Sequence, residues 1–311
     1  MAGLTAARAL HDAGLRVQVL EKSRGLGGRL ATRRTRDGLT FDHGAQFAKA
    51  REEGFTAYLE AARAAGSAGD WVQDDGSVLP VGTPGMRDLV GPLAEGLAVA
   101  FDTTAATIAR DGHNWLVALA EDAKTVRARA VVLAVPAPQA ALLCRDVDGE
   151  LSQALGAVEM DPCLAAMVAF EEPLASGRSL YRDPTPELQW LSRESAKPDR
   201  PPAPDRWVIH GAPGWSHGLL EQSKDDIADA LLSLARAVWE ADGVTVPPPL
   251  RLIGHRWRYA RTRTALGRPF AAGGDGTLLA GGDWALGPRV EAAFRSGSAM
   301  ADALFERLQT A

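Results

Sequence analysis

The order of apolar and polar positions predicts a helix at the start of the chain and a strand directly after it. Small and apolar side chains recur at helical intervals over residues 2–13 and stop at Gly14, a suitable left-handed residue just past a helix end. Residues 15–21 then alternate apolar and polar side chains and end in the acid Glu21. A helix that leads into such a strand is half of a βαβ unit.

The next part of the chain predicts a helix and a run of strands. Helical spacing returns over residues 52–65, and strand patterns over residues 99–109, 115–120 and 126–130 together indicate a β-meander. The continuous apolar run over residues 130–135 is typical of a parallel strand that is buried on both faces. The chain therefore returns to a central sheet after the meander.

The remaining residues predict a second domain and a final return to the first. Residues 145–270 are richer in Trp, Pro and Arg, and their Pro-rich stretch over residues 197–205 suggests a surface connection. Residues 278–283 have the form of a short strand that delivers an acid to a loop, and Pro288 suits the first turn of a last helix over residues 289–308. We therefore expect an α/β protein with a parallel sheet and a β-meander, joined to a smaller α+β domain with a mixed or antiparallel sheet.

Composition agrees with an ordinary globular protein and excludes several classes. The length of 311 residues suggests about two domains, and 46% hydrophobic and 23% charged residues argue against disorder and fibrous structure. The formal net charge is −5, so we expect no nucleic-acid partner. The one basic cluster, from Arg24 to Arg36, needs another explanation.

The cysteines and the lack of apolar spans bear on the chemistry and the compartment. Cys144 and Cys163 lie in apolar or mixed surroundings and no Cys or His spacing suits a metal, so we expect free thiols, no metal site and a reducing compartment. No stretch reaches the roughly 20 apolar residues of a spanning helix, and no signal-peptide pattern opens the chain. We expect a cytoplasmic protein with no membrane partner.

The first helix and strand fit the end of a dinucleotide-binding motif. That motif needs a strand, the pattern G-x-G-x-x-G, a helix, and an acid roughly 20 residues further on that binds a ribose hydroxyl. Met1, Ala2 and Gly3 would supply its last three positions and Glu21 its acid. An unrelated helix and strand ending in Glu would fit this segment equally well.

The first strand of this motif and its first two glycines are missing. Either Met1 is an internal methionine and the natural protein is longer by about ten residues, or the chain is truly truncated and binds its cofactor poorly. We expect the former, because an empty central position would expose the hydrogen-bonding groups and apolar side chains of the neighbouring strands.

Residues 24–33 favour the nucleotide-binding interpretation. The pair Gly27 and Gly28 is bracketed by arginines, so backbone amides and guanidinium groups can approach a pyrophosphate, whereas the alternative is a solvated basic loop. The segment resembles the R-x-x-G-G-R-x-x-[ST] stretch of the flavin amine oxidase superfamily and matches it through Thr32. Residues 41–47 (FDHGAQF) resemble the D-H-G-A-Q-[YF] segment of its renalase-like branch, which runs beside the isoalloxazine ring.

Three later stretches resemble the same branch and follow in its order. Residues 207–216 are similar to its W-V-x-H-A-x-x-x-W-S strand and turn, with Gly211 where Ala is usual, and residues 255–260 are similar to its H-R-W-x-Y-A strand. Residues 282–297 resemble the closing motif of the superfamily, G-D, then G-x-x-V-E-x-A, then S-G. Their joint occurrence by chance is far less likely than the chance occurrence of any one of them.

The resemblance implies an oxidoreductase that binds FAD non-covalently. It implies a Rossmann-like FAD-binding domain made of residues 1–50, 96–144 and 273–311 and a substrate domain made of residues 51–95 and 145–272. In the family, the Asp of the closing motif binds the ribityl chain, and the N-terminus of the following helix stabilises the anion of the reduced ring. The residues implied as FAD contacts are Gly3, Glu21, Lys22, Arg24, Gly27, Gly28, Arg29, His43, Gly44, Ala45, Gln46, Ala105, Asp283, Arg289 and Val290.

The resemblance also implies an activity. Renalase-like enzymes oxidise isomeric dihydronicotinamides, the 2- or 6-dihydro forms of NAD(P)H, and pass the electrons to O2. A dihydropyridine can lose a hydride to flavin N5 without a strong general base, so we expect no catalytic triad. Candidate substrate contacts, each of which also suits a structural role, are Gln46, His210, Arg256, Trp257 and Tyr259.

Two other functions stay open at this point. One is a related amine or porphyrinogen oxidase. Amine oxidases often place a lysine near flavin N5, but none of the five lysines lies in such a motif, and we expect Lys49 to be solvent-exposed. The other is a catalytically silent protein that binds nucleotide poorly, which true truncation would produce.

Overall fold

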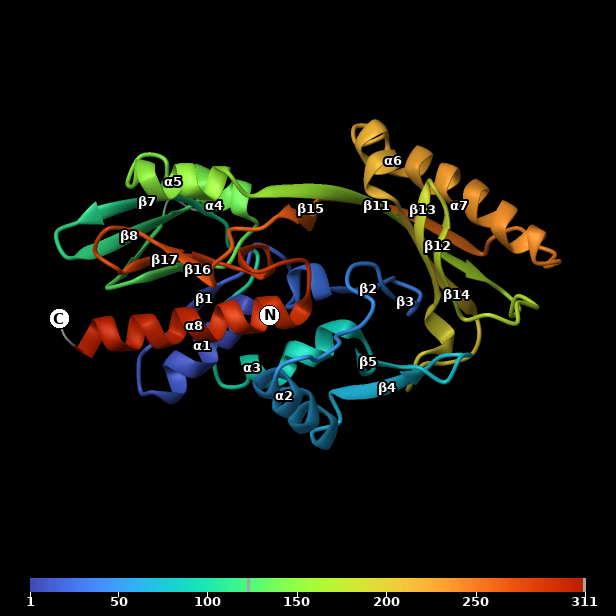
Figure 1. Ribbon diagram of the computed structural model, residues 1–311, viewed down its shortest axis with the longest axis horizontal. Coiled ribbons are helices and arrows are strands. Elements are labelled where there is room, and N and C mark those ends of the chain that lie inside the picture. Colours follow the sequence, from blue (N-terminus) through green and yellow to red (C-terminus); the bar gives the residue numbers. More distant parts are fainter. Residues whose placement is uncertain (122–123, 310–311) are drawn as a thin grey trace.

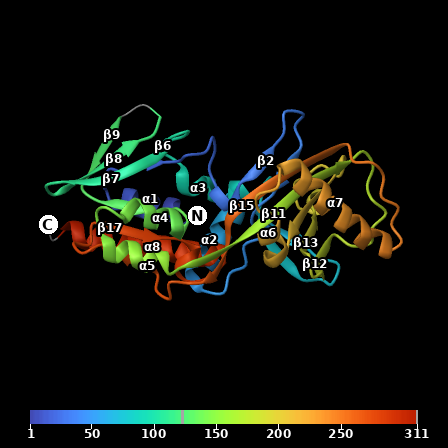
Figure 2. The same cartoon turned by 90° about the horizontal axis from the view of Figure 1, so that it is seen from above.

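In the computed structural model, the chain forms two lobes that are connected by two long strands (Figure 1). The structure describes residues 1–121 and 124–309. One lobe holds the parallel strand pairs, and the other is built around an antiparallel sheet. Strands β11 (Glu159–Phe170) and β15 (Arg251–Thr264) run from one lobe into the other, as the view from above also shows (Figure 2).

The first lobe is built around two short parallel strand pairs. Strand β1 (Gln18–Leu20) pairs with β6 (Ala98–Ala100), and β10 (Val131–Leu133) pairs with β17 (Leu278–Gly281), whose other edge is antiparallel to β16 (Phe270–Ala272). Helix α1 (Ala2–Asp12) packs against helix α8 (Val290–Gln309). This approach needs a glycine, because a Cβ on Gly297 would lie 2.4 Å from the carbonyl oxygen of Ala2. The remaining elements of the lobe are β7 (Ala105–Asp111), β8 (Asn114–Leu119), β9 (Thr125–Ala128), α4 (Ala137–Cys144) and α5 (Gly149–Gly156).

The structure confirms most of the predicted elements of this lobe and corrects others. The first helix is present, and Gly14 just beyond it has a φ of +83°. The meander is present as the antiparallel sheet β7-β8-β9, and the last helix is within one residue of its predicted range. The single strand expected over residues 99–109 is wrong. It is divided into β6 and β7 because the chain turns at Asp102, which has a φ of +49°.

A channel separates the two parallel strand pairs. Among the described residues, no backbone hydrogen bond joins β1 to β10, and the two strands belong to different sheets. Residues 15–20 line one side of the channel and residues 128–135 the other. The expectation that this second segment is buried on both faces is therefore wrong, since Val131 and Val132 border the channel and are only half-buried. Strand β1 is also shorter than predicted, because it is paired on one side only.

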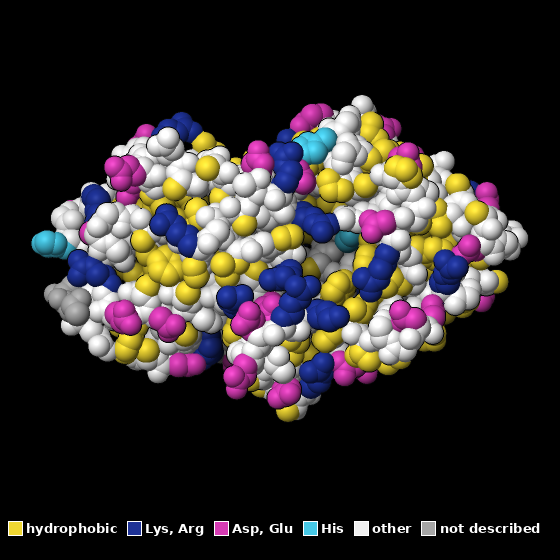
Figure 3. Space-filling view, viewed as in Figure 1, with side chains coloured by type: hydrophobic (Ala, Val, Ile, Leu, Met, Phe, Trp, Pro, Cys, Tyr) yellow, Lys and Arg dark blue, Asp and Glu magenta, His cyan; other side chains and the backbone are white. Residues whose placement is uncertain are grey.

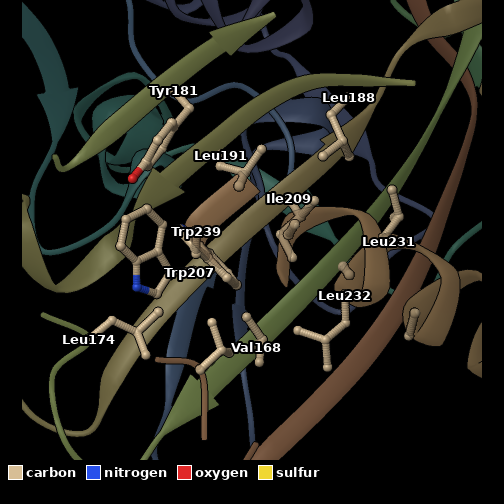
Figure 4. Packing of buried hydrophobic residues seen from close by; sticks show 14 of the residues in the cluster. Val168, Leu174, Tyr181, Leu188, Leu191, Trp207, Ile209, Leu231, Leu232 and Trp239 are labelled. Atoms are coloured by element: carbon tan, nitrogen blue, oxygen red, sulfur yellow. The ribbon is translucent and has the colours of Figure 1, made fainter. Parts of the chain in front are cut away.

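The second lobe is a five-stranded antiparallel sheet in the order β12-β13-β14-β11-β15. Its new strands are β12 (Leu180–Thr185), β13 (Leu188–Arg193) and β14 (Asp205–Gly211), and its helices are α6 (Pro213–Gly218) and α7 (Lys224–Ala241). One face of the sheet packs against α7 and forms a hydrophobic core with it (Figure 4). The sheet contributes Leu191, Trp207 and Ile209, and the helix contributes Leu231 and Trp239. Because side chains alternate along a strand, the opposite face is available to a site between the lobes.

Residues 51–95 form a small unit that touches both lobes. Its core packs against α8, where the ring of Phe55 lies 5.4 Å from that of Phe294, and it also contacts Leu180 and Trp190 of the antiparallel sheet. The proposed division of the chain into FAD-binding and substrate segments stays a prediction. The elements not yet named are α2 (Glu53–Ala64), β4 (Ala68–Val72), β5 (Val78–Gly82), α3 (Gly91–Ala94), the hairpin β2 (Thr32–Arg34) and β3 (Thr40–Asp42), and the 3-10 helices Gly28–Leu30, Met86–Val90, Glu194–Ala196 and Asp283–Ala285.

A cluster of four buried charges joins the β2-β3 hairpin to the second lobe. Lys197 Nζ lies 3.3 Å from Asp42 and 2.5 Å from Glu194, and the guanidinium of Arg200 pairs with both carboxylates. Burial alone would raise the pKa of Asp42, but the charges of Lys197 and Arg200 outweigh it and the pKa is lowered. The Pro-rich stretch that begins at Lys197 is only partly the expected surface connection. Residues 201–203 are exposed, but the side chains of Lys197 and Arg200 are buried against Asp42.

Replacing the buried lysine tests the weight of this cluster. We expect Lys197→Met to lower the free energy of unfolding by about 3–5 kcal/mol, because two buried carboxylates lose a compensating charge. Urea unfolding of the purified protein measures it. The matched control is Lys49→Met, at an exposed site, which should stay within about 0.5 kcal/mol of the parent. An equal effect of the two substitutions would show that the cluster contributes little.

Candidate functional site

A single large cavity lies between the lobes and has a volume of about 3080 Å³. Ordinary small-molecule pockets occupy about 300–1,000 Å³, and the larger volume here includes the channel between β1 and β10. All fifteen residues predicted to contact FAD and all five predicted substrate contacts line it. The structure thus brings together residues as far apart in the chain as Gly3 and Val290.

Strand and helix ends converge on the nucleotide end of the cavity. Glu21 directly follows β1, and its Oε1 accepts a hydrogen bond from the backbone amide of Ser23 at 2.8 Å. Gly27 and Gly28 have φ values of +113° and +55°, and a Cβ on Gly28 would meet nothing within 4 Å. A ligand can therefore approach the backbone closely at Gly28.

The closing motif lies against the glycine segment. Arg29 donates to both carboxylate oxygens of Asp283, at 2.9 and 2.5 Å, so two predicted cofactor residues are paired with each other. The N-terminus of α8 lines the cavity at Arg289 and Val290 and presents the positive end of the helix dipole. Inside the same turn, Glu291 accepts hydrogen bonds from two backbone amides of the segment before α2, at 2.6 and 2.8 Å.

Three imidazole rings meet in the wall of the cavity. The ring of His43 lies 4.6 Å from that of His255 and 5.0 Å from that of Trp257, between centroids. The carbonyl oxygen of His43 accepts hydrogen bonds from Trp257 Nε1 at 2.7 Å and from His210 Nε2 at 3.1 Å. Burial, with repulsion from Arg33 at two of the rings, lowers the pKa of His43 and His210 to about 4 and that of His255 to about 3. All three rings are therefore neutral at pH 7.

The side chain of Gln46 is fully engaged inside the protein. Its amide nitrogen donates to the carbonyls of Asp42 and Gly44, and its oxygen accepts from Ser192 Oγ at 2.7 Å and from Lys197 Nζ at 2.9 Å. With both polar groups taken, Gln46 has no hydrogen bond left for a substrate carboxamide. The geometry therefore favours a role in holding the segment after β3, not the substrate contact expected from the sequence.

The other predicted substrate residues lie along β14 and β15. Trp257 and Tyr259 follow His255 at every second position of β15, and all three line the cavity. Arg256 donates to the carbonyl of Gln222, which engages one of its nitrogens. These contacts to a substrate stay predictions.

The charge of the cavity wall differs sharply from that of the whole protein. Of the 34 Lys and Arg residues, 18 line the cavity, against four of the 39 acidic residues. Figure 3 shows Lys and Arg side chains gathered around a hollow near the centre of the molecule. A net charge of −5 therefore conceals a strongly positive cavity.

Sequence reasoning missed several residues at this site. Arg182 and Trp190 of the antiparallel sheet line the cavity, yet they stand in no recognisable motif. Lys197 was missed because a proline-rich context suggests the surface. Only the strand pairing in the structure, which places Arg182 beside Trp190, identifies Arg182 as part of this site.

The described part of the chain holds neither a metal-binding cluster nor a membrane-spanning helix. Within residues 1–121 and 124–309, no three His, Cys, Asp or Glu side chains are arranged to hold a metal ion. Over the same residues, no helix is both long and apolar enough to span a bilayer. Cys144 and Cys163 are free, and burial raises the pKa of their thiols to about 11 and 12.

The fold and the cavity define a two-lobed oxidoreductase with a dinucleotide cofactor. The family model described as flavin containing amine oxidoreductase matches residues 1–69 and 52–305. The chain belongs to this family, and the protein is a FAD-dependent oxidoreductase.

Solved structures agree with this fold. Cyclohexylamine oxidase from Brevibacterium oxydans IH-35A is 13% identical with a TM-score of 0.69, and the match covers 99% of this chain and 97% of that one. Putrescine oxidase bound to putrescine is 14% identical with a TM-score of 0.64, over 98% and 97% of the two chains. A protein assigned as a protoporphyrinogen oxidase from Exiguobacterium sp. 255-15 is 17% identical with a TM-score of 0.53. That match covers 74% of this chain and only about half, 52%, of the other. At these identities the likeness concerns the fold alone.

The residues at the nucleotide end fit FAD. The open space at Gly28, the guanidinium of Arg29 and the α8 N-terminus suit a pyrophosphate and a ring that becomes anionic, and Glu21 suits a ribose hydroxyl. Bound FAD supplies a two-electron acceptor. The chain itself supplies the positive surroundings.

The histidine cluster predicts how stability depends on pH. Each ring has a lower pKa in the folded protein than the usual histidine value of 6.5, so the unfolded state binds more protons below that value and stability falls as the pH falls. Between pH 7.5 and 5 we expect a loss of about 2 kcal/mol for each of the three histidines. Urea unfolding at pH 7.5, 6 and 5 measures it.

A matched pair of variants separates the cluster from other titrating groups. His255→Gln should reduce the loss, whereas His113→Gln, at an exposed turn, should leave it unchanged. A free energy of unfolding that is constant over this pH range would contradict the neutral state of the three rings.

Proposed function

We propose that the protein oxidises an isomeric dihydronicotinamide nucleotide, the 2- or 6-dihydro form of NAD(P)H, in the manner of renalase-type enzymes. The products are the aromatic nicotinamide cation and, after the electrons pass through FAD to O2 with uptake of a proton, hydrogen peroxide. The observation that carries this proposal is the charge of the cavity wall, where 18 cationic residues stand against four acidic ones.

The cations extend well beyond the nucleotide end. Those of the glycine segment can neutralise the pyrophosphate of FAD. On the other lobe, Arg251 and Arg258 line the cavity but are paired with acidic side chains. Arg182 and Arg261 also line it and form no ion pair within 4 Å among the described residues, which leaves positive charge for a second anionic ligand. A field of this sign attracts a phosphorylated substrate and repels an alkylammonium ion, so it argues against amines.

The uncharged part of the wall suits a nicotinamide ring. Trp257 and Tyr259 offer flat faces, and the neutral ring of His210 adds no positive charge beside a substrate that becomes a cation. No strong base is required, because loss of a hydride makes the pyridine ring aromatic and positioning carries most of the catalysis. The buried Lys197 is held by Asp42, Glu194 and Gln46, so it is not free to act as one.

Parallel oxygen-consumption assays test the proposal. We expect turnover of 2- or 6-dihydro-NAD(P) and none of putrescine or cyclohexylamine. For the nucleotide, kcat/KM should fall as ionic strength rises, because salt screens the cavity charge. The riboside of the same dihydronicotinamide, which lacks phosphates, is the control and should show no such salt dependence. Faster turnover of the amines would overturn the proposal.

A second candidate follows from the same charge. Porphyrinogens carry several carboxylates, so the cationic wall also favours oxidation of a porphyrinogen. Turnover of a porphyrinogen together with inertness toward every dihydronicotinamide would select this candidate. A third outcome, a flavin that no substrate reduces, would favour the catalytically silent alternative.

We also propose that an extended apolar segment, continuous with Met1, fills the channel between β1 and β10. Both strands leave one edge without a backbone partner among the described residues, and half-buried Val131 and Val132 border the channel. Unpaired strand edges and apolar walls are costly to leave in an internal position. An inserted strand would join the two parallel pairs into one sheet at the nucleotide end.

Adding a strand ahead of Met1 tests this. An extension of about ten residues, with alternating apolar side chains and a final Gly-x-Gly, should raise both the flavin content and the midpoint of thermal unfolding. Visible absorption followed by acid release of the chromophore measures the flavin. A Gly/Ser extension of equal length is the control. Equal flavin content in the two extended proteins and the 311-residue chain would contradict the proposal.

We also propose that the protein acts in the cytoplasm. Two free thiols suit the reducing conditions of the cytoplasm, where nicotinamide nucleotides are abundant substrates.

A further inference from the structure

We propose that Arg182, stacked on Trp190 and Phe47, forms a subsite for a phosphate group of the substrate. This inference rests on the proposed function, because it assigns a place to the anionic part of a dihydronicotinamide nucleotide. The subsite lies on the antiparallel sheet, on the opposite lobe from the glycine segment that suits the pyrophosphate of FAD.

Strand pairing places this subsite in a row across the whole sheet. Arg182 pairs with Trp190, Trp190 with His210, His210 with Ala165, and Ala165 with His255. Residues that are directly paired in an antiparallel sheet project from the same face. The neighbouring positions, such as Leu191 and Ile209, project from the other face into the core under α7. The core under α7 therefore does not explain this row, although Trp190 also packs against the core of residues 51–95.

The guanidinium of Arg182 is held in place by aromatic rings. It lies 4.8 Å from the ring of Trp190 and 5.8 Å from that of Phe47, and the two rings are stacked at 5.7 Å. Stacking fixes the plane of a guanidinium and leaves its N–H groups free at the edge. That arrangement suits paired hydrogen bonds to phosphate oxygens.

Arg182 also differs from Arg251 and Arg258 in its partners. Arg251 pairs with Asp37 at 2.8 Å, and Arg258 pairs with Glu221 at 2.8 Å. Among the described residues, no carboxylate lies within 4 Å of Arg182. Hydrogen bonds within its own turn and, less strongly, the charge of Arg182 lower the pKa of Asp75, but the side chains of Arg182 and Asp75 form no ion pair within 4 Å. A cation of the cavity wall that lies over aromatic rings and has no paired carboxylate is suited to bind an anionic ligand.

A second polar group beside Arg182 also lacks a partner. The indole N–H of Trp190 is buried and has no hydrogen-bond acceptor in the described part of the chain, although the residue lines the cavity. A buried donor without an acceptor is costly, and an oxygen of a bound anion would satisfy it. The guanidinium of Arg182 therefore supplies the accessible donors of the subsite, and the indole N–H of Trp190 joins them only where a bound anion displaces the atoms that cover it.

The position of the subsite suits a nucleotide. His210 lies two strands away from Arg182, about 10 Å across the sheet. A ring held near His210 and Trp257 could then reach Arg182 with a phosphate attached through its ribose. The same spacing would leave Arg182 unused by a small amine.

Anion binding to the FAD-loaded protein tests the subsite, because FAD then occupies the other anion site. Titration calorimetry with pyrophosphate as the probe should show at least tenfold weaker binding for Arg182→Gln, an intermediate loss for Arg182→Lys and a several-fold loss for Trp190→Phe. The matched control is Arg178→Gln, since Arg178 stacks on Tyr181 at 5.6 Å and lies outside the cavity lining. This control should bind pyrophosphate as the parent does.

Kinetics provide a second readout that a merely structural role would not give. For the dihydronicotinamide nucleotide, Arg182→Gln should raise KM at least tenfold with kcat nearly unchanged, and it should not affect the riboside. Parent-like pyrophosphate binding by Arg182→Gln, or a loss confined to kcat, would overturn the subsite.

Two outcomes separate the subsite from the proposed function. Arg182-dependent binding of pyrophosphate without turnover of any dihydronicotinamide would support the phosphate site and overturn the function. Citrate is the carboxylate probe, and if it bound more tightly than pyrophosphate in an Arg182-dependent way, the assignment to phosphate would be wrong.

Discussion

Four buried charges determine how the two lobes face each other. Asp42 stands at the end of β3, and its carboxylate is held by Lys197 and Arg200 of the second lobe, by the hydroxyl of Thr32 and by the backbone amide of Met86. The segment that follows carries the wall of the cavity. Because each charge has partners of the opposite sign, the cluster can be buried without a large penalty, and its directional contacts admit few alternative arrangements.

Charge sorting is the second organising feature. The protein keeps most of its acidic residues on the outside and directs about half of its cations toward one cavity. Such sorting produces an attractive field at the cavity while the protein as a whole stays acidic. The polarity of the site is thus a property of the folded chain that composition alone conceals.

Periodicity and turn residues in the sequence correctly predicted the elements that depend on local interactions. The first helix with Gly14, the meander and the last helix follow from periodicity and turn residues, and the glycine and closing segments were assigned to one nucleotide site that the cavity unites. The errors arose where tertiary contacts decide. A strand was divided at Asp102 by a single backbone angle, and Lys197 was buried by partners that lie about 150 positions away in the sequence.

The candidate substrate residues also show that tertiary contacts cannot be predicted from local sequence patterns. Gln46 was chosen from its motif, but hydrogen-bond partners from β13 and the buried lysine use all of its polar capacity. Arg182 has no motif, and only its strand neighbours show that it belongs to the cavity. Residue type and spacing identify a segment as functional, whereas the direction of each side chain depends on the complete set of neighbours.

The shared carbonyl of His43 has one further chemical consequence. A carbonyl oxygen can only accept hydrogen bonds, so the Nε2 atom of His210 that points to it must carry the proton. Since this ring is neutral at pH 7, its Nδ1 is then unprotonated. The backbone of one lobe thereby selects the tautomer of a histidine in the other, and it makes His210 a hydrogen-bond acceptor at Nδ1, suited to the N–H of an amide and not to its oxygen.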